Sequence, residues 1–300
     1  MFDNIKAVLS SDENVVKFVF DTTNAVAEAV LYKYPTYQKR TVICCSTQSG
    51  CPVGCVFCGT GKFFTRNLTA GEMVQQVKHA VDYTNTNPDS IEKFQIMFMS
   101  MGEPLLNYNE LEKAIEELGF LYPNAQLLVS TSLPETTANC SSSGPFGKFL
   151  KLSKIFKNIG IQFSVHESSD FERRKLIPTR TSSLSVIAYC GESWFRATGR
   201  KPFFNYCVHE GNNKQDDVAR LLEEFNPDVW EVTLSVICEK DQSMKNAIEE
   251  KLEMVTSFAS LMASSGYSTR VFNPAGQDDI GGGCGQLWYV QEWAKNHQQK

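Results

Sequence analysis

The chain has 300 residues, of which 42% are hydrophobic, enough for one large α/β domain or two small ones. Its net charge of −5 argues against a protein that coats nucleic acid through bulk positive charge, although a local basic cleft remains compatible with it. The 10 cysteines indicate a reducing compartment and metal or redox chemistry, because disulfide scaffolds are typical of short secreted chains. We find no signal peptide and no apolar run approaching the ~18 residues of a membrane span, so we expect a cytoplasmic monomer with no membrane partner.

The first forty residues carry two short apolar runs, at 15–20 and 25–32. Alternating and β-branched apolar residues favour strands. We therefore predict that residues 1–40 form an N-terminal extension built on a β-hairpin, which leads into the main domain.

From residue 41 onward, strand-like and helix-like segments alternate. The predicted strands are residues 41–46, 94–99, 126–130, 160–165, 202–208, 229–237 and 268–272. The predicted helices are residues 69–83, 109–119, 149–159, 183–198, 218–225 and 244–265, the first opened by the capping box Thr69-Ala70-Gly71-Glu72 and the second capped by Asn109. Strands separated by helices predict right-handed βαβ units and a parallel sheet.

The alternation gives about six β/α units and a terminal strand, fewer than a closed eight-fold barrel needs. We therefore predict an α/β fold in which residues 41–300 form an open, partial (β/α)6 barrel. In such folds the chemistry lies at the carboxyl ends of the strands.

Three cysteines, Cys51, Cys55 and Cys58, follow the first predicted barrel strand in the run Cys-Pro-Val-Gly-Cys-Val-Phe-Cys. Thiolates suit a soft iron site, and a 4Fe–4S cluster normally takes four, so three would leave one iron open. A zinc loop and merely packed thiols remain alternatives. Zinc loops, however, favour paired Cys-x2–4-Cys units and a fourth ligand.

This loop, with an aromatic residue before its third cysteine, resembles the signature of radical S-adenosylmethionine (SAM) enzymes. The resemblance implies a 4Fe–4S cluster on the three cysteines, with the open iron chelating the amino and carboxylate groups of SAM. The turn Gly102-Glu103-Pro104 follows the second barrel strand. In these enzymes a turn of this kind binds the SAM amino group, and a carboxylate suits an ammonium.

Further motifs narrow the resemblance to the RlmN/Cfr family of radical SAM methyltransferases, over roughly residues 28–287. The matching segments are residues 47–51, 66–72, 101–107, 130–132, 164–166, 173 with 177–178, and 279–287, the last containing Cys-Gly-Gln-Leu. The resemblance implies methylation of carbon 2 of an adenine in RNA, either rRNA or tRNA. It also implies an electron donor such as flavodoxin.

The resemblance implies three catalytic residues. One SAM methylates Cys284, and a second is cleaved to a 5′-deoxyadenosyl radical that activates the new methyl group for addition to adenine. Cys44 then resolves the covalent adduct by forming a disulfide with Cys284, whereas Cys45 should point to the opposite face of its strand. Glu28 is the candidate acceptor of the ring proton, although the run from Val30 to the first barrel strand is longer than in the family.

The resemblance also implies contacts to SAM: Ser130 near its carboxylate and Ser164, Val165 and His166 near its adenosine. Cys238 stands where the family has an asparagine that contacts SAM. The family usually carries an N-terminal RNA-binding helical domain, for which this chain has no room.

Seven basic residues could contact phosphate or simply cover a solvated surface: Arg173, Arg174, Lys175, Arg180, Arg196, Arg200 and Lys201. The departures from the family, at Cys238 and in the missing N-terminal domain, leave two further hypotheses open. One is a radical SAM enzyme of the same scaffold with another substrate, such as a tRNA, a nucleotide or a protein. The other is a non-enzymatic iron–sulfur or zinc protein.

Overall fold

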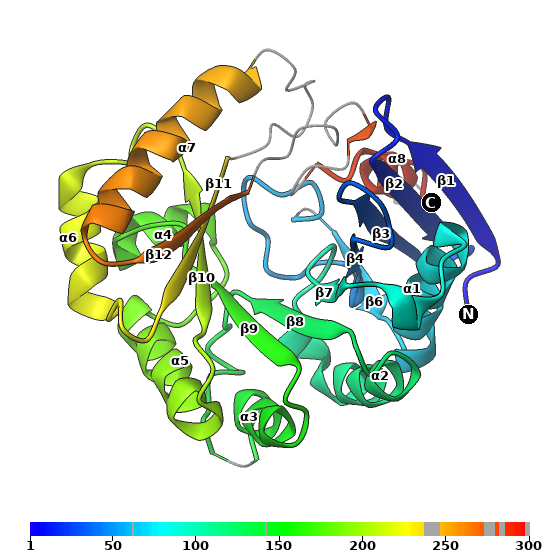
Figure 1. Cartoon of the computed structure of the whole chain (residues 1–300), viewed down its shortest axis with the longest axis horizontal. Coiled ribbons are helices and arrows are strands. Elements are labelled where there is room, and N and C mark those ends of the chain that lie inside the picture. The colour runs from blue at the N-terminus through cyan, green and yellow to red at the C-terminus, as the bar shows by residue number, and fades with distance from the viewer. Residues whose placement is uncertain (62, 142, 237–246, 273–279, 282–285, 298–300) are drawn as a thin grey trace.

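The structure is a computed structural model that describes residues 1–61, 63–141, 143–236, 247–272, 280–281 and 286–297 (Figure 1). Its centre is a ten-stranded sheet with the strand order β1-β2-β3-β4-β7-β8-β9-β10-β11-β12. The first three strands pair antiparallel with one another and with β4: β1 Asn4–Leu9, β2 Val15–Asp21, β3 Val26–Lys33 and β4 Arg40–Cys45. The predicted hairpin is therefore confirmed, and β1 adds a strand that we did not predict.

The seven strands from β4 to the end of the sheet run parallel, as predicted. After β4 they are β7 Lys93–Phe98, β8 Gln126–Thr131, β9 Ile159–Ser164, β10 Phe203–Val208, β11 Glu231–Val236 and β12 Ser268–Phe272. No pairing joins β12 to β1 among the described strands, so the sheet is an open, partial barrel.

Most of the helices cover the outer face of the curved sheet (Figure 1), but the last one lies on the opposite face, where its Tyr289 approaches Lys6 and Lys17. The helices are α1 Ala70–Thr84, α2 Tyr108–Leu121, α3 Pro145–Ile155, α4 Asp170–Leu176, α5 Leu184–Thr198, α6 Gln215–Glu224, α7 Ala247–Ser264 and α8 Trp288–His297. Two short 3-10 helices, η1 Pro88–Ser90 and η2 Pro104–Asn107, connect them to the strands. The main core lies between sheet and helices. Most residues of β4, β9, β10 and β11 are buried, so those strands read as nearly continuous apolar runs.

The capping box at the start of α1 is confirmed, because Glu72 N donates to Thr69 Oγ1 at 3.2 Å and Thr69 N donates to Glu72 Oε2 at 2.9 Å. The predicted cap of α2 is wrong. That helix begins before Asn109, and Asn107 precedes it without a side-chain cap, since its Nδ2 donates instead to the carbonyls of Thr47 and Leu68.

In the part of the chain that the structure describes, no helix has the length and apolar character needed to cross a membrane.

Candidate active site

The cysteine loop follows the first parallel strand, at the carboxyl end of the barrel. A short antiparallel pair, β5 (Gln48–Gly50) and β6 (Phe64–Asn67), brings the two ends of the loop together. Cys51 N donates to the Phe63 carbonyl at 2.8 Å, and Cys58 N donates to the Cys55 carbonyl at 3.1 Å. The backbone thus holds all three thiols in one compact loop.

The thiol environment is suited to a metal cluster. Burial raises the pKa of Cys51 to about 12, although N–H groups of Val53 and Gly102 favour its thiolate. Burial also raises the pKa of Cys55 well above its ordinary value, and the neighbouring cysteines raise it further. Thiolates here need cationic metal to offset their desolvation.

Among the described residues, no three His, Cys, Asp or Glu side chains converge as ligands of one metal ion. In a 4Fe–4S cluster each thiolate binds a different iron, so the three cysteines need not converge on one point. The donor set therefore fits the cluster, and the described residues give the single-zinc alternative no support.

The turn after β7 is shaped by Gly102, which has φ of +101°. A Cβ atom at this position would lie 2.7 Å from the Cβ of Gln48, so both the conformation and the packing require glycine. The next residue, Glu103, is 3% exposed. Because Gly102 lies so close to Gln48, the turn packs against β5, the strand that leads into the cysteine loop.

The carboxylate of Glu103 accepts four hydrogen bonds from the protein. Oε1 accepts from Thr131 Oγ1 at 2.5 Å and Leu105 N at 3.1 Å, and Oε2 accepts from Ser132 N at 2.8 Å and Ser132 Oγ at 2.9 Å. Burial raises the pKa of this carboxyl, while these donors oppose the shift. Glu103 therefore organises the end of β8, and its role toward SAM stays a prediction.

The other predicted SAM contacts lie at the ends of two neighbouring strands, Ser130 on β8 and Ser164 on β9. Val165 and His166 follow directly, and the N–H groups of both donate to the Asn205 carbonyl, at 3.0 and 3.1 Å. These residues therefore lie at the carboxyl end of the sheet, and their contacts to SAM stay a prediction.

His166 is held in a fixed, neutral state. Burial, together with the charge of Arg173, lowers its pKa to about 3. Its Nδ1 accepts from Cys207 N at 3.2 Å, which leaves the ring proton on Nε2. The ring also meets Phe57 of the cysteine loop edge-to-face, with centroids 5.3 Å apart. This contact ties the end of β9 to the cluster loop.

Arg173 corrects our expectation of a phosphate surface. Its guanidinium is 1% exposed and donates to the carbonyls of Ser132, Ser164, Val165 and Ser182 and to Thr181 Oγ1. All its donors are used inside the protein, where they hold the ends of β8 and β9 together. Arg200 likewise donates to three backbone carbonyls and stacks on Trp194.

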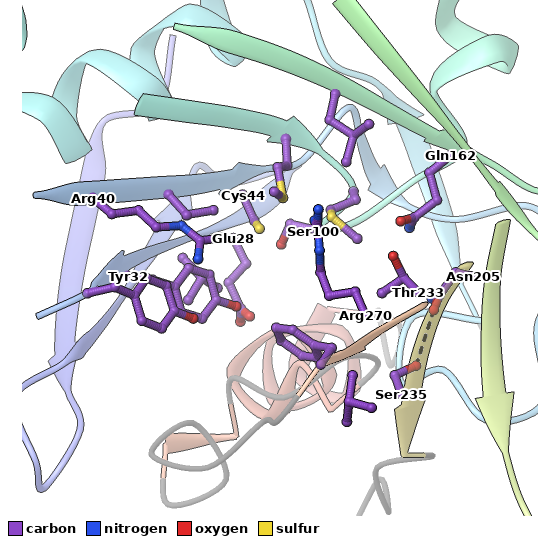
Figure 2. Close-up of a pocket in the computed structure, with 18 of the residues that line it drawn as sticks. Glu28, Tyr32, Arg40, Cys44, Ser100, Gln162, Asn205, Thr233, Ser235 and Arg270 are labelled. Atoms are coloured by element: carbon purple, nitrogen blue, oxygen red, sulfur yellow. Dashed lines mark hydrogen bonds between the residues drawn. The ribbon is translucent and has the colours of Figure 1, made fainter. Parts of the chain in front are cut away.

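A cavity of about 490 Å³ lies inside the curved sheet and is lined by side chains from β3, β4 and β7 to β12 (Figure 2). Glu28, Cys44, Arg40 and Arg270 all line it, together with Leu287 near the C-terminus. Its described lining contains neither the cluster cysteines nor the predicted SAM contacts. Two lining residues connect it to those contacts: Gln162 donates to Ser130 Oγ at 3.4 Å, and Asn205 accepts from the backbone after β9.

Cys44 and Cys45 point to opposite faces of β4, as predicted. Cys44 belongs to a small apolar cluster with Val30, Tyr32 and Ile280, whereas Cys45 belongs to the main core. Because Ile280 precedes the predicted Cys-Gly-Gln-Leu motif by only a few residues, this cluster brings the C-terminal segment to the face of β4 that carries Cys44.

Glu28 faces the same cavity from β3. Val30 pairs with Cys44 across the strands, so Glu28, two residues before Val30, lies diagonally from Cys44 on the same face. The Glu28 side chain is 1% exposed, and Lys17 Nζ lies 3.1 Å from its Oε1. Apart from this ammonium, neither carboxylate oxygen has a polar partner among the described residues. Full burial raises the pKa of Glu28, and the Lys17 charge opposes that shift.

Cys284 and Cys238 lie outside the described residues. Described residues lie before and after Cys284 in the chain, and their contacts are known. Before it, the Gly281 carbonyl accepts a hydrogen bond from Lys17. After it, the Gln286 carbonyl lies so close to Gly59 that a Cβ atom there would be 2.5 Å from the Gln286 oxygen. Gly59 directly follows Cys58, so the C-terminal segment meets the cluster loop.

Our sequence reasoning missed Lys17, Thr131 and Asn205 as residues of the site. Lys17 had a detectable signal, since it is the one charge in the apolar run 15–20 and Glu28 is the one charge in the next run. Opposite single charges in two paired apolar strands indicate a buried ion pair. Thr131 and Asn205 had no such signal, because their roles depend on contacts between distant strands.

Comparison with known proteins places the chain among methyltransferases. No family model matches it. It is 31% identical to "Ribosomal RNA large subunit methyltransferase N" of Nitrosopumilus maritimus, covering 94% of this chain and 79% of the relative. It is 30% identical to "Probable dual-specificity RNA methyltransferase RlmN" of Thermus thermophilus, covering 95% of this chain and 77% of that relative.

Among solved structures, the chain superposes on a radical SAM methyltransferase from Sphaerobacter thermophilus with a TM-score of 0.79, at 27% identity over 95% of this chain and 80% of that one. A spore photoproduct lyase, at 14% identity and a TM-score of 0.50, shares the fold alone. The cysteine loop, the parallel partial barrel and the relatives agree: the chain belongs to the RlmN/Cfr family of radical SAM RNA methyltransferases, enzymes that use SAM and a 4Fe–4S cluster.

Proposed function

We propose that the chain transfers a methyl group from SAM to carbon 2 of an adenine in RNA, by way of a methylated Cys284. The observation that carries this proposal is the shared cavity of Glu28 and Cys44, which face it from neighbouring strands. A base and a resolving thiol on one wall of a cavity suit a reaction in which the product is first tethered and then released.

In this proposal Cys51, Cys55 and Cys58 hold the cluster, and the ends of the next strands hold SAM. Gly102 and Glu103 take its amino end, Ser130 its carboxylate, and Ser164, Val165 and His166 its adenosine, with Cys238 as a further contact. The bound cluster and SAM supply radical chemistry that activates an otherwise inert methyl group. A one-electron donor such as flavodoxin supplies the reductant, and the enzyme works as a monomer.

The cavity supports a nucleobase as substrate. At about 490 Å³ it is large enough for a base and its sugar, and it combines apolar side chains with a few polar groups, as ligand sites usually do. Enzymes that modify a base take it out of the stack and into such a pocket. The Arg40 and Arg270 guanidinium groups in the lining suit the phosphates beside the extruded nucleotide.

Glu28 is proposed as the base that accepts the proton from the ring carbon after the carbon–carbon bond has formed, and the bound cluster, which gives up one electron when SAM is cleaved, would take up the unpaired electron of the adduct. Apart from the Lys17 ammonium, the Glu28 oxygens have no polar partner among the described residues, so lone pairs remain for this proton. Burial raises its pKa above that of an ordinary carboxyl, which makes it a better proton acceptor while Lys17 favours its ionised form.

Cys44 is proposed to release the product. Its thiolate attacks the sulfur of Cys284, so that a sulfur–sulfur bond forms and the bond from that sulfur to the methylene carbon breaks. The electron pair of the broken bond stays with the carbon, which takes up a proton and becomes the product methyl group. The resulting disulfide is reduced by a cellular dithiol before the next turnover.

The test is anaerobic incubation of the cluster-loaded protein with reductant, RNA and SAM that carries a deuterated methyl group, followed by mass spectrometry of the nucleosides. We expect 2-methyladenosine whose methyl group retains two of its three deuterium atoms, because one hydrogen is removed on the protein and one is gained from solvent. A methyl group with all three deuterium atoms would indicate direct displacement and overturn the route. SAM cleavage without a methylated nucleoside would indicate another substrate on the same scaffold.

A further inference from the structure

Lys17 carries a fully buried ammonium whose contacts extend beyond its ion pair with Glu28. Its side chain is 0% exposed, on β2, two strands away from Cys44. Burying a lysine is costly, and an apolar residue in its place is often at least as stabilising as a buried ion pair. Stability alone therefore does not account for a lysine here.

The ammonium is directed at three groups from different parts of the chain. It donates to the Gly281 carbonyl, lies 3.1 Å from Glu28 Oε1, and lies 5.7 Å from the centroid of the Tyr289 ring on α8. An ammonium has three donors, and an aromatic face within about 6 Å attracts a cation. Lys17 thus connects Glu28 to the C-terminal segment both before and after the undescribed residues 282–285.

The strand register explains why Lys17 can reach these groups. Lys17 pairs with Val30, which in turn pairs with Cys44, so all three lie in one row on the same face of the sheet. Glu28 lies diagonally from Lys17 on that face. The lysine therefore stands on the same surface as the two proposed catalytic groups of β3 and β4.

The described part of the C-terminal segment is built to receive this contact. Gly281 has φ of +60°, and a Cβ atom there would lie 2.3 Å from the Trp288 ring. Only glycine suits this turn, which packs against the first residue of α8. Ile280, one residue earlier, is buried in the cluster that contains Cys44. The carbonyl that Lys17 holds is thus fixed beside the catalytic face.

We propose that Lys17 is a positioning residue, which fixes the C-terminal segment at Gly281 and holds the Glu28 carboxylate in place beside it. This inference rests on the proposed function for the role of Glu28, but the contact to Gly281 does not depend on it. Loss of the ammonium should loosen the C-terminal segment and leave Glu28 without its countercharge.

The first test measures the segment without catalysis. Hydrogen exchange of the peptide that spans Gly281 and Tyr289 should be faster in Lys17→Met than in the parent protein. Lys6→Met is the matched control, because Lys6 lies 4.5 Å from the same Tyr289 ring but contacts neither Glu28 nor Gly281. The double variant Lys17→Met/Glu28→Gln balances the buried charge, so it keeps the test valid if the single variant folds poorly.

Faster exchange in both Lys17 variants, with Lys6→Met unchanged, supports the anchor. The proposed anchor is overturned if the exchange rate is unchanged in both Lys17 variants, or if it rises equally in Lys6→Met. If the parent protein fails to methylate RNA while this exchange pattern holds, the proposed function fails and the anchor stands.

The second test measures the pH dependence of methylation in single turnover. The described charged and titratable groups around Glu28 are Lys17, Tyr32, Tyr34, Arg40, Cys44, Arg270 and, beyond Lys17, Tyr289. Removing the lysine cation makes Glu28 harder to ionise, so the acid limb of Lys17→Met should move to higher pH by about one unit or more, and activity should recover at alkaline pH. A loss of rate that is equal at every pH would overturn the link to Glu28, because a purely structural defect has that signature.

Discussion

The Glu103 carboxylate ties the turn after β7 to the end of β8. Its four hydrogen bonds come from the Thr131 hydroxyl and from Ser132 and Leu105, all of them buried. With both oxygens engaged, the side chain is rigid before any ligand arrives. Such preorganisation fixes the turn that we propose to take the amino end of SAM.

We predict that Glu103→Ala lowers both the stability of the protein and its affinity for SAM. The substitution leaves the Thr131 hydroxyl and the Ser132 N–H buried without an acceptor, which costs about 1–3 kcal/mol for each unsatisfied group. Denaturant unfolding without SAM measures the first effect, and equilibrium binding of SAM measures the second.

Glu116→Ala, an exposed substitution on α2, is the control and should change neither quantity. Unchanged unfolding of Glu103→Ala would mean that the carboxylate does not hold the strand ends. A lower free energy of unfolding with an unchanged affinity for SAM would show that Glu103 does not belong to the SAM site.

The positions of residues in sequence motifs were predicted more fully than the positions of residues outside them. The cysteine loop and the Gly102-Glu103 turn were placed correctly at the carboxyl ends of their strands. A motif that directly follows a predicted strand must lie at the carboxyl end of that strand. Arg173 was misplaced. The sequence shows a basic residue in a basic cluster, and only the packed structure shows that five hydrogen bonds turn its guanidinium inward.

At the scale of elements, α1 shows how a local signal is reinforced by distant contacts. The capping box is visible in the sequence, but Glu72 also forms an ion pair with Arg66 on β6, with Arg66 Nη2 2.7 Å from Glu72 Oε1. Burial of Glu72 opposes its ionisation, yet the Arg66 and Thr69 hydrogen bonds outweigh burial and lower its pKa. The helix start is thereby joined to the strand that closes the cysteine loop.

We predict that this arrangement makes stability sensitive to acid. Because the folded-state pKa of Glu72 lies below its unfolded value, the stabilisation is complete above the unfolded value of about 4.3 and is lost as pH falls through the folded one. Glu72→Gln should therefore be less stable near neutral pH, by about 0.5–2 kcal/mol for a weakened cap, and should lose less stability than the parent as pH falls below about 4.

Denaturant unfolding at several pH values measures both differences. The control is Glu117→Gln, an exposed position on α2, which should follow the parent. If the free energies of unfolding of Glu72→Gln and the parent depend on pH in the same way, the ion pair contributes nothing to the acid sensitivity.

The elements most readily predicted were those with long periodic patterns. All seven parallel strands were predicted, because most of them carry buried apolar runs that alternate along the chain with helix-like segments. The strand β1 was missed, since most of its residues are exposed and only pairing with β2 makes it a strand. The helix α4 has only 7 residues, too few to show a helical period, and it was missed as well.

At the scale of the whole molecule, the two ends of the chain meet. The helix α8 lies beside the N-terminal strands (Figure 1). Its Tyr289 ring lies against Lys6 of β1 and Lys17 of β2. Leu287 lines the cavity with Glu28 and Cys44, and Gln286 contacts the cluster loop at Gly59. The open barrel thus gathers at one cavity residues that are far apart in sequence, as the proposed covalent route requires.

The most direct test of that route is the variant Cys44→Ala, incubated anaerobically with reductant, SAM and labelled RNA and then resolved on a denaturing gel. If Cys44 releases the product, this variant should accept the methyl group, react with RNA and then stall. It would appear as a protein–RNA band that nuclease removes, and the trapped RNA can be sequenced. Cys45→Ala, on the opposite face of the same strand, should turn over without such a band. Normal turnover by Cys44→Ala, with no trapped band, would contradict the account.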